Sequence, residues 1–345
     1  MNCHLLVPEL FWPAASGADP YRDLALPALE TILARGRRTR TPGSSLERWL
    51  AAAFHADAGR ELPLAPAALR GDGGEPRDHW WLQADPVHLK VHGDRLILAD
   101  ASRFAVSPDE ARELTAALNS HFASEGIAFV APQPQRWYAR IAAAPRIRTT
   151  PTAEAAGRNI ERFLPTGEDG ARWRKIINEA QMALHAHRCN EDREARGELP
   201  INSVWFWGAG RASDEPSGSP YAAVWSKHPL ATGLALANGI RPRPLPESAT
   251  ALLQSLGDTP RDQAQLVALD PLPGTAYGDI AAWRKTMLEY EDRWFQPLLA
   301  AARSPAFDIL SLHALGPDYG VCCEFLRRDR SKFWRRRRPL HTYAD

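Results

Sequence analysis

The sequence predicts an α/β fold: a core sheet with helices on both faces and a small α+β module inserted into it. After position 200, short apolar runs alternate with stretches of helical periodicity, which is typical of an α/β sheet. Before it, a β-hairpin signal is followed by a helix and two more strands. We therefore expect residues 1–75 and 190–345 to form the core, and residues 76–189 to form the inserted module.

Composition narrows the class of protein. The 345 residues are 44% hydrophobic and 24% charged, which is ordinary globular composition. A formal net charge of +1 excludes a whole-chain field that would steer the protein to nucleic acid or to an anionic membrane. The four cysteines show no metal-site or disulfide spacing, so reduced thiols are expected.

Targeting and membrane signals are missing from the sequence pattern. The first residues lack the basic region of a signal peptide, and no apolar run approaches the ~20 residues of a membrane span. We therefore expect a cytoplasmic protein that does not bind membranes.

The first 76 residues predict a strand, two helices and a linker. The strand is the apolar run 3–7, and the first helix lies within 20–34. A capping-box pattern that includes Ser45 opens the second helix. The basic stretch 35–40 predicts a solvated turn, with an anion-binding loop as the alternative. Residues 62–76 are rich in Pro, Gly and Ala, and predict a linker.

The expected module begins with a hairpin. Strands at 87–91 and 95–99 are joined by a His-Gly-Asp turn signal. A helix then starts at a Ser-Pro-Asp-Glu cap and ends at Gly126. Two strands, 127–130 and 137–141, complete this α+β arrangement.

The remaining elements are expected from their periodicity. Apolar residues at helical spacing predict helices at 173–187 and 283–298, and shorter ones before Asn238 and at 247–256. The pair His185 and His187 is too closely spaced to share one side of a helix, so it predicts a surface pair and not a metal site. The expected strands are 201–206, 221–225, 265–269, 307–312 and 319–326, the last two as an antiparallel edge.

The stretch 199–210 carries the most distinctive pattern, a buried strand that runs into a Gly-Ala-Gly turn. A dinucleotide fingerprint would need a third glycine at position 213, where Ser213 stands, so that function is excluded. Trp205 and Trp207 are two apart and share one face of the strand. At the carboxyl end of a core strand they would line a ligand cleft; the alternative is that both are packed in the core.

The same stretch resembles a known family. Its Asn-x-x-Trp-x-Trp-Gly-x-Gly pattern is similar to a strand of archaeal-type cofactor-independent phosphoglycerate mutases, members of the alkaline phosphatase superfamily. The runs 79–89 and 205–210 resemble more closely the RpfE-type regulatory proteins, a bacterial branch related to these mutases. The resemblance implies a phosphatase-like core. It also gives the candidates for a ligand cleft: Asp85, Asn202, Trp205, Trp207, Gly208 and Gly210.

Departures from the mutase pattern shape the functional expectation. A mutase of this superfamily holds two divalent metals with Asp and His near a phosphate-accepting Ser or Thr. Where Asp-Gly should follow the first strand, Glu9 stands, and of the late Asp-x-x-x-His pair only Asp270 remains. The weak catalytic candidates are therefore Glu9, Ser45 and Asp270, and no metal-ligand set is complete.

We accordingly expect a non-catalytic regulatory or binding protein without a cofactor. Its partner would be another protein or a small phosphorylated ligand. The alternative is an active phosphoglycerate mutase or phosphatase that uses Mn or Mg through altered ligands.

The C-terminal segment suggests a further function. Arg335, Arg336, Arg337 and Arg338 follow the neighbours Phe333 and Trp334. Arginines suit phosphate contacts and aromatic rings stack on bases, so nucleic-acid or acidic-partner binding is one interpretation. The other is a solvated tail, or one that pairs with acidic surface of its own domain.

Overall fold

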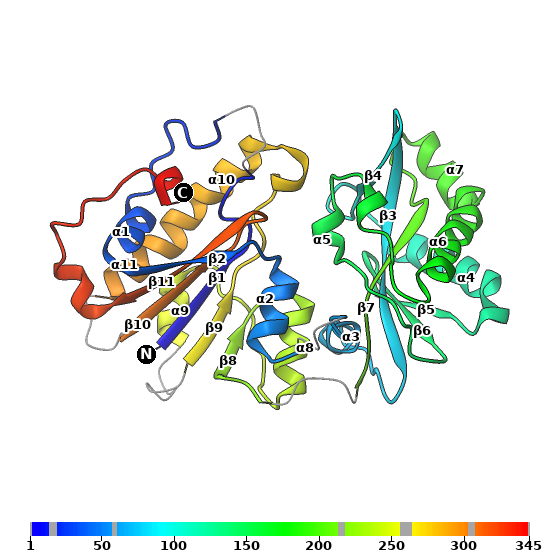
Figure 1. Cartoon of the computed structure of the whole chain (residues 1–345), viewed down its shortest axis with the longest axis horizontal. Helices are drawn as coiled ribbons and strands as arrows, with labels where there is room; N and C mark the ends of the chain where they lie inside the picture. The colour runs from blue at the N-terminus through cyan, green and yellow to red at the C-terminus, as the bar shows by residue number, and fades with distance from the viewer. Residues whose placement is uncertain are drawn as a thin grey trace. The chain divides into compact units, whose positions relative to one another are not determined.

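The computed structural model describes residues 2–13, 19–56, 61–212, 218–255, 264–302 and 308–343. The chain divides into two compact units. Unit 1 comprises Met1–Trp49 and Gly218–Asp345, and unit 2 comprises Leu50–Ser217. Each unit has its own sheet (Figure 1). Ser213, and residues 256 and 307 at the ends of two predicted elements, lie outside the described residues.

The sheet of unit 1 has six strands in the order β2-β11-β10-β1-β9-β8. The four from β10 to β8 are parallel, and β11 and β2 extend the sheet antiparallel. The predicted first strand is confirmed, and it lies inside the sheet, where Leu5 pairs with Leu312 on one side and Val267 on the other. The strands are β1 Asn2–Val7, β2 Arg37–Pro42, β8 Tyr221–Trp225, β9 Ala264–Ala268, β10 Ile309–Ala314 and β11 Tyr319–Leu326.

Helices lie on both faces of this sheet, as predicted (Figure 1). On one face, Leu29, Trp283 and Leu298 join the sheet residues in a single apolar core. On the other, Trp49 contacts the ring of His313 at 4.8 Å between centroids. The helices are α1 Pro27–Arg35, α2 Leu46–Ala53, α8 Pro229–Ala237, α9 Ala249–Ser255, α10 Ile280–Tyr290 and α11 Gln296–Ala301.

A π-helical turn, η5 Glu291–Phe295, joins α10 to α11. It directs Glu291 at the start of α1, where its two carboxylate oxygens accept hydrogen bonds from the backbone N–H groups of Ala28 (2.5 Å) and Leu29 (3.1 Å). The residue before α1, Leu26, has no side chain that could cap it. Glu291 therefore supplies from another helix the acceptor that the first turn of α1 needs.

The sheet of unit 2 is antiparallel, with the order β4-β3-β6-β5 and with β7 also paired to β3. The sequence pattern places strand 201–206 in the core sheet, and the structure corrects this. Phe206 packs with Trp173 and Phe129, so the apolar face of β7 is buried by the helices of unit 2. The strands are β3 Trp80–His92, β4 Arg95–Ala99, β5 Ala128–Gln133, β6 Arg136–Ile141 and β7 Ser203–Arg211.

Among the helices of unit 2, α4 (Pro108–His121) follows its sequence signal closely. Both bonds of the predicted capping box form: Ser107 Oγ accepts from the N–H of Glu110 (3.2 Å), and the Glu110 carboxylate accepts from the N–H of Ser107 (2.8 Å). Gly126 ends this region with a φ of 68°. The helices are α3 Ala65–Gly71, α4 Pro108–His121, η1 Ala123–Glu125, α5 Thr152–Ala155, η2 Ile160–Arg162, α6 Gly170–His185 and α7 Arg188–Ala195.

Two segments predicted as irregular are regular. Residues 37–40 of the basic stretch belong to β2, which pairs with the edge of β11. The predicted linker contains α3, whose small residues pack against β7. A Cβ at Gly210 would lie 2.8 Å from the Cα of Pro63, so this close approach requires glycine. None of the described helices has the length and apolar character to cross a membrane.

Candidate functional site

The carboxyl ends of the parallel strands in unit 1 form the first candidate site. In open α/β sheets, ligands bind beyond these ends. Strand β9 lies between β1 and β8 in the sheet. Strands β1, β8 and β9 end at Val7, Trp225 and Ala268. The segments that follow carry Glu9, Lys227 and Asp270. Two of the three predicted catalytic candidates, Glu9 and Asp270, therefore follow strands that end at this edge.

Glu9 is held in an unusual backbone conformation. Its φ is 58°, in the left-handed region that non-glycine residues rarely adopt. The carboxylate accepts a hydrogen bond from the hydroxyl of Thr275. The Glu9 carbonyl oxygen accepts another from the indole N–H of Trp283 at 3.0 Å. Glu9 thus anchors the segment that leads from β9 into α10.

Asp270 has a basic neighbour. Its Oδ2 lies 4.0 Å from Nζ of Lys227, and the two side chains are 51% and 66% exposed. The carbonyl oxygen of Asp270 accepts a hydrogen bond from the hydroxyl of Tyr290 at 2.8 Å. Burial raises the pKa of Tyr290, so the phenol remains a donor. The edge therefore presents an accessible ammonium beside an accessible carboxylate.

Ser45, the third candidate, begins α2. Its Oγ accepts from the backbone N–H of Arg48 at 3.3 Å, so the hydroxyl acts as the predicted helix cap. The neighbouring Ser44 donates its N–H to the carbonyl of Gly316 at 3.1 Å, which fixes this turn against the β10–β11 connection.

A two-metal centre does not fit these residues. Within residues 2–13, 19–56, 61–212, 218–255, 264–302 and 308–343, no three His, Cys, Asp or Glu side chains converge to hold a metal ion. A centre of that kind needs several such ligands around each ion. The described residues therefore do not assemble the donor set that phosphoryl transfer by two metals requires.

Asp85 is the centre of a polar cluster in unit 2. Its Oδ2 accepts from the indole N–H of Trp207 at 2.7 Å and from the hydroxyl of Thr152. Burial, with a smaller contribution from the nearby Asp100, raises the pKa of Asp85 to about 6. The positive charge of Arg136 lowers the pKa of Asp85, but the Arg136 guanidinium itself binds both carboxylate oxygens of Asp72.

Glu61 was not identified from the sequence. Its carboxylate accepts from the backbone N–H groups of Thr149 (2.7 Å), Gly208 (3.1 Å) and Ala209 (3.2 Å), and from the hydroxyl of Thr149. Gly208 has a φ of 73°, which directs its N–H toward this acceptor. The sequence pattern predicts a turn at 208–210, but these residues continue strand β7, with a bulge between the pairs Gln83–Trp207 and Trp81–Gly210. This bulge encloses a carboxylate of its own chain. The Gly-Ala-Gly run, whose backbone N–H groups need an acceptor, was its only sequence signal.

The other cleft candidates also bond within unit 2. Trp205 and Trp207 are 1% and 4% exposed, and the Trp205 indole donates to the carbonyl of Thr150 at 2.8 Å. The Asn202 side chain accepts from the N–H of Leu89 (2.7 Å) and donates to its carbonyl (3.0 Å). The structure thus brings Asp85, Trp205 and Trp207 together on one face of the β3–β7 pair, with both indoles packed.

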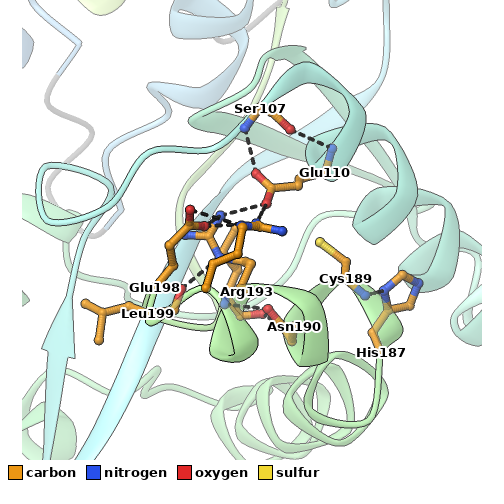
Figure 2. Close-up of polar contacts among 10 residues, drawn as sticks. Ser107, Glu110, His187, Cys189, Asn190, Arg193, Glu198 and Leu199 are labelled. Atoms are coloured by element: carbon orange, nitrogen blue, oxygen red, sulfur yellow. Dashed lines mark hydrogen bonds and ion pairs between the residues drawn. The ribbon is translucent and has the colours of Figure 1, made fainter.

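A second polar network positions the start of β7 (Figure 2). Arg193 is 1% exposed; its guanidinium lies 3.0 Å from the Glu110 carboxylate and donates to the carbonyl of Leu199 at 2.8 Å. Asn190 bonds both backbone groups of Ile201, at 2.7 and 2.9 Å. These contacts link α4, α7 and the segment before β7, and are structural.

The histidine and cysteine at the start of α7 belong to the same structural region. Nδ1 of His187 accepts from the N–H of Cys189 at 3.2 Å, so this histidine caps the helix (Figure 2). Burial raises the pKa of the Cys189 thiol to about 11, which keeps it protonated and unreactive at neutral pH.

Comparison with known proteins supports a phosphoglycerate-mutase-like scaffold. No family model matches the chain. Curated 2,3-bisphosphoglycerate-independent phosphoglycerate mutases of Methanosarcina mazei and Methanosarcina barkeri are 31% and 29% identical over 139 and 132 residues, 38% of this chain in each case. The chain spans only 34% and 32% of the length of these relatives.

Solved structures show the same fold over nearly the whole chain. The cofactor-independent phosphoglycerate mutase of Thermoplasma acidophilum has a TM-score of 0.51 at 14% identity, covering 99% of this chain and 94% of that one. A protein of Pyrococcus horikoshii has a TM-score of 0.56 at 12% identity, covering 94% and 87%. The mixed α/β fold predicted from the sequence is therefore that of cofactor-independent phosphoglycerate mutases; the RpfE-type resemblance stays a prediction.

Proposed function

We propose that this chain is a non-catalytic, RpfE-type binding or regulatory protein on a mutase-like scaffold, and that it holds a small phosphorylated ligand at the carboxyl edge of unit 1. The observation that carries the proposal is Lys227. Its ammonium lies 4.0 Å from the single aspartate that remains of the expected metal ligands. A cation of the protein itself stands where a metal-dependent enzyme would concentrate carboxylates.

The geometry of this edge favours an anion. The Lys227 side chain is 66% exposed, so its charge is accessible to a ligand. Helix α8 begins two residues later, at Pro229, and the N-terminal end of a helix carries partial positive charge. A phosphate group at this point would be attracted by both. The scaffold resemblance adds that the relatives named above are phosphoglycerate mutases.

Ligand binding is tested by calorimetry with 3-phosphoglycerate and with inorganic phosphate. Because hydrogen bonds to charged groups contribute about 1.5–3 kcal/mol, Lys227→Met is expected to weaken binding at least tenfold. Lys90→Met, an exposed lysine of unit 2, is the matched control. Undetectable binding of both ligands, or equal binding by the two variants, would remove the proposed ligand site.

Catalysis is tested separately. Purified protein is titrated with Mn²⁺, and phosphatase and mutase turnover are measured in its presence. We expect neither stoichiometric metal binding nor turnover. The alternative, a metal-dependent mutase or phosphatase with altered ligands, requires both metal binding and turnover, and both should be lost in Asp270→Asn. Both should be retained in the control Asp94→Asn, because the Asp94 side chain is 96% exposed in unit 2. That pattern would overturn the non-catalytic proposal.

A further inference from the structure

A cation-rich surface of unit 1 takes no part in the proposed phosphate site at the carboxyl edge. We call it the arginine surface. It combines the outer strand β2 with the segment that follows β11, drawn in red in Figure 1. Every cationic residue of this surface except Lys332 is exposed. The residues are Arg37, Arg38, Arg40, Arg327, Arg328, Arg330, Lys332, Arg335, Arg336, Arg337 and Arg338.

This segment is fixed to the unit and is not a loose tail. The guanidinium of Arg35 donates to the carbonyl of Arg330 at 2.7 Å, and that of Arg335 donates to the carbonyls of Arg35 and Gly36 at 3.4 Å. Farther along, Leu340 is 1% exposed and Tyr343 is buried. The guanidinium carbon of Arg38 lies over the Tyr343 ring, 4.7 Å from the ring centroid. The backbone that carries these cations is therefore fixed on the unit.

Positive charge is in excess on this surface. Asp329 is 1% exposed and is engaged by Lys332 at 2.6 Å and by the N–H of Leu326. Within the part of the chain that the structure describes, no carboxylate lies within ion-pair distance of Arg327 or Arg336. Clustered guanidinium groups of this kind attract a polyanion and lose that attraction as salt is added.

Two aromatic rings stand exposed among these cations. Phe333 and Trp334 are 77% and 65% exposed, and their ring centroids lie 5.4 Å apart at an interplanar angle of 80°. Neighbouring large side chains of this exposure are unusual unless a ligand covers them. Unpaired bases stack on such rings, whereas the bases of a duplex are already stacked on one another and an acidic peptide chain offers no comparable faces.

We propose that the arginine surface binds single-stranded nucleic acid, with arginines on the phosphates and Phe333 and Trp334 stacked on bases. The proposed ligand edge plays no part in this inference. It is tested on the full chain by fluorescence anisotropy with a labelled oligouridylate of about 16 nucleotides, the upper range for a compact binding surface.

The first variant removes the stacking rings. Base–aromatic stacking contributes about 1–3 kcal/mol per base, so Phe333→Ala with Trp334→Ala is expected to weaken binding at least tenfold. The second variant, Arg327→Gln with Arg336→Gln, should lower the slope of log affinity against log salt by about 1.4, or about 0.7 for each phosphate that an arginine no longer neutralises. Arg140→Gln with Arg148→Gln, two exposed arginines of unit 2, should leave affinity and slope unchanged.

The unmodified protein gives a test that depends on no variant. An unlabelled single strand should displace the probe, while duplex of equal length and polyglutamate should compete far more weakly. Equal competition by duplex or polyglutamate would overturn the proposal, because it would show a merely electrostatic surface. Full affinity in the variant without the two aromatic rings would overturn it as well.

Discussion

The two units differ in the hydrogen-bond partners that they give to their carboxylates. Glu61 and Asp85 in unit 2 accept hydrogen bonds from backbone and indole N–H groups of their own unit. In unit 1, Glu9 bonds a threonine hydroxyl, and Asp270 is half exposed beside a lysine at 4.0 Å. Acidic residues near a strand end therefore do not by themselves indicate a ligand site. What matters is whether the chain already supplies their partners.

Physical chemistry explains why the first pair is structural. A carboxylate removed from water is costly unless donors replace the lost hydration. Glu61 accepts from three backbone N–H groups, and two of them lie at the bulge in β7, where the pairing with β3 is interrupted. Removing such residues should harm the fold, whereas removing the half-exposed Asp270 of unit 1 should affect ligand binding.

The largest effect is expected for Glu61→Ala. The backbone N–H groups of Thr149, Gly208 and Ala209 lose their common acceptor, so we expect a loss of about 3–5 kcal/mol in the free energy of unfolding, measured in urea. Glu75→Ala, in an exposed pair with Arg77, should cost less than about 1 kcal/mol. Equal costs for the two variants would contradict a structural role for Glu61.

Asp85 is expected to make unit 2 more stable in mild acid. Its pKa is raised from 3.8 to about 6 in the folded protein, so the folded state binds the proton first. Stability should rise by about 2–3 kcal/mol as pH falls from about 6 toward 3.8, and this gain is absent above about 6. Hydrogen exchange of the β3 and β7 amides, corrected for intrinsic rates, measures it. Asp85→Asn should abolish the gain.

His313 is expected to give unit 1 the opposite pH dependence. Burial, and then the neighbouring His4 with ring nitrogens 3.0 Å apart, lower the pKa of His313 from 6.5 to about 3. The unfolded chain then binds more protons, so stability is greatest above pH 6.5 and falls toward pH 3. At about pH 5 the loss should be about 2 kcal/mol. Hydrogen exchange of the β1 and β10 amides measures this loss. An exchange profile against pH that is unaltered by His313→Gln would contradict the prediction.

The smallest expected effect separates the two tryptophans of β7. Trp207 donates to a carboxylate and Trp205 to a backbone carbonyl, both within unit 2. The change to Phe removes the same volume from each, so the difference reports the hydrogen bond. Hydrogen bonds to charged groups contribute about 1.5–3 kcal/mol and neutral ones about 0.5–1.5. Trp207→Phe should therefore be the more destabilising by about 1 kcal/mol in urea unfolding.

Sequence pattern predicted elements better than it predicted partners. The strand 319–326 and the capping box at Ser107 are visible locally, because apolar alternation and a cap depend only on near neighbours. The partner of strand 201–206 is β3, more than 100 residues earlier, and nothing in the strand itself specifies that pairing. Strand β2 was missed because its exposed arginines and threonines need no buried face. Glu61 could be found only through the contacts it makes.

The π-helical turn between α10 and α11 has a consequence for comparing this chain with others. A π-helical turn is equivalent to one residue inserted into an α-helix. Deleting that residue would rotate everything after it by about 100° and turn Leu298 away from the core. Glu291 begins this turn and would keep its place at the start of α1. A one-residue gap at 292–295 in an aligned chain would therefore signal that a residue other than the counterpart of Leu298 packs into its core.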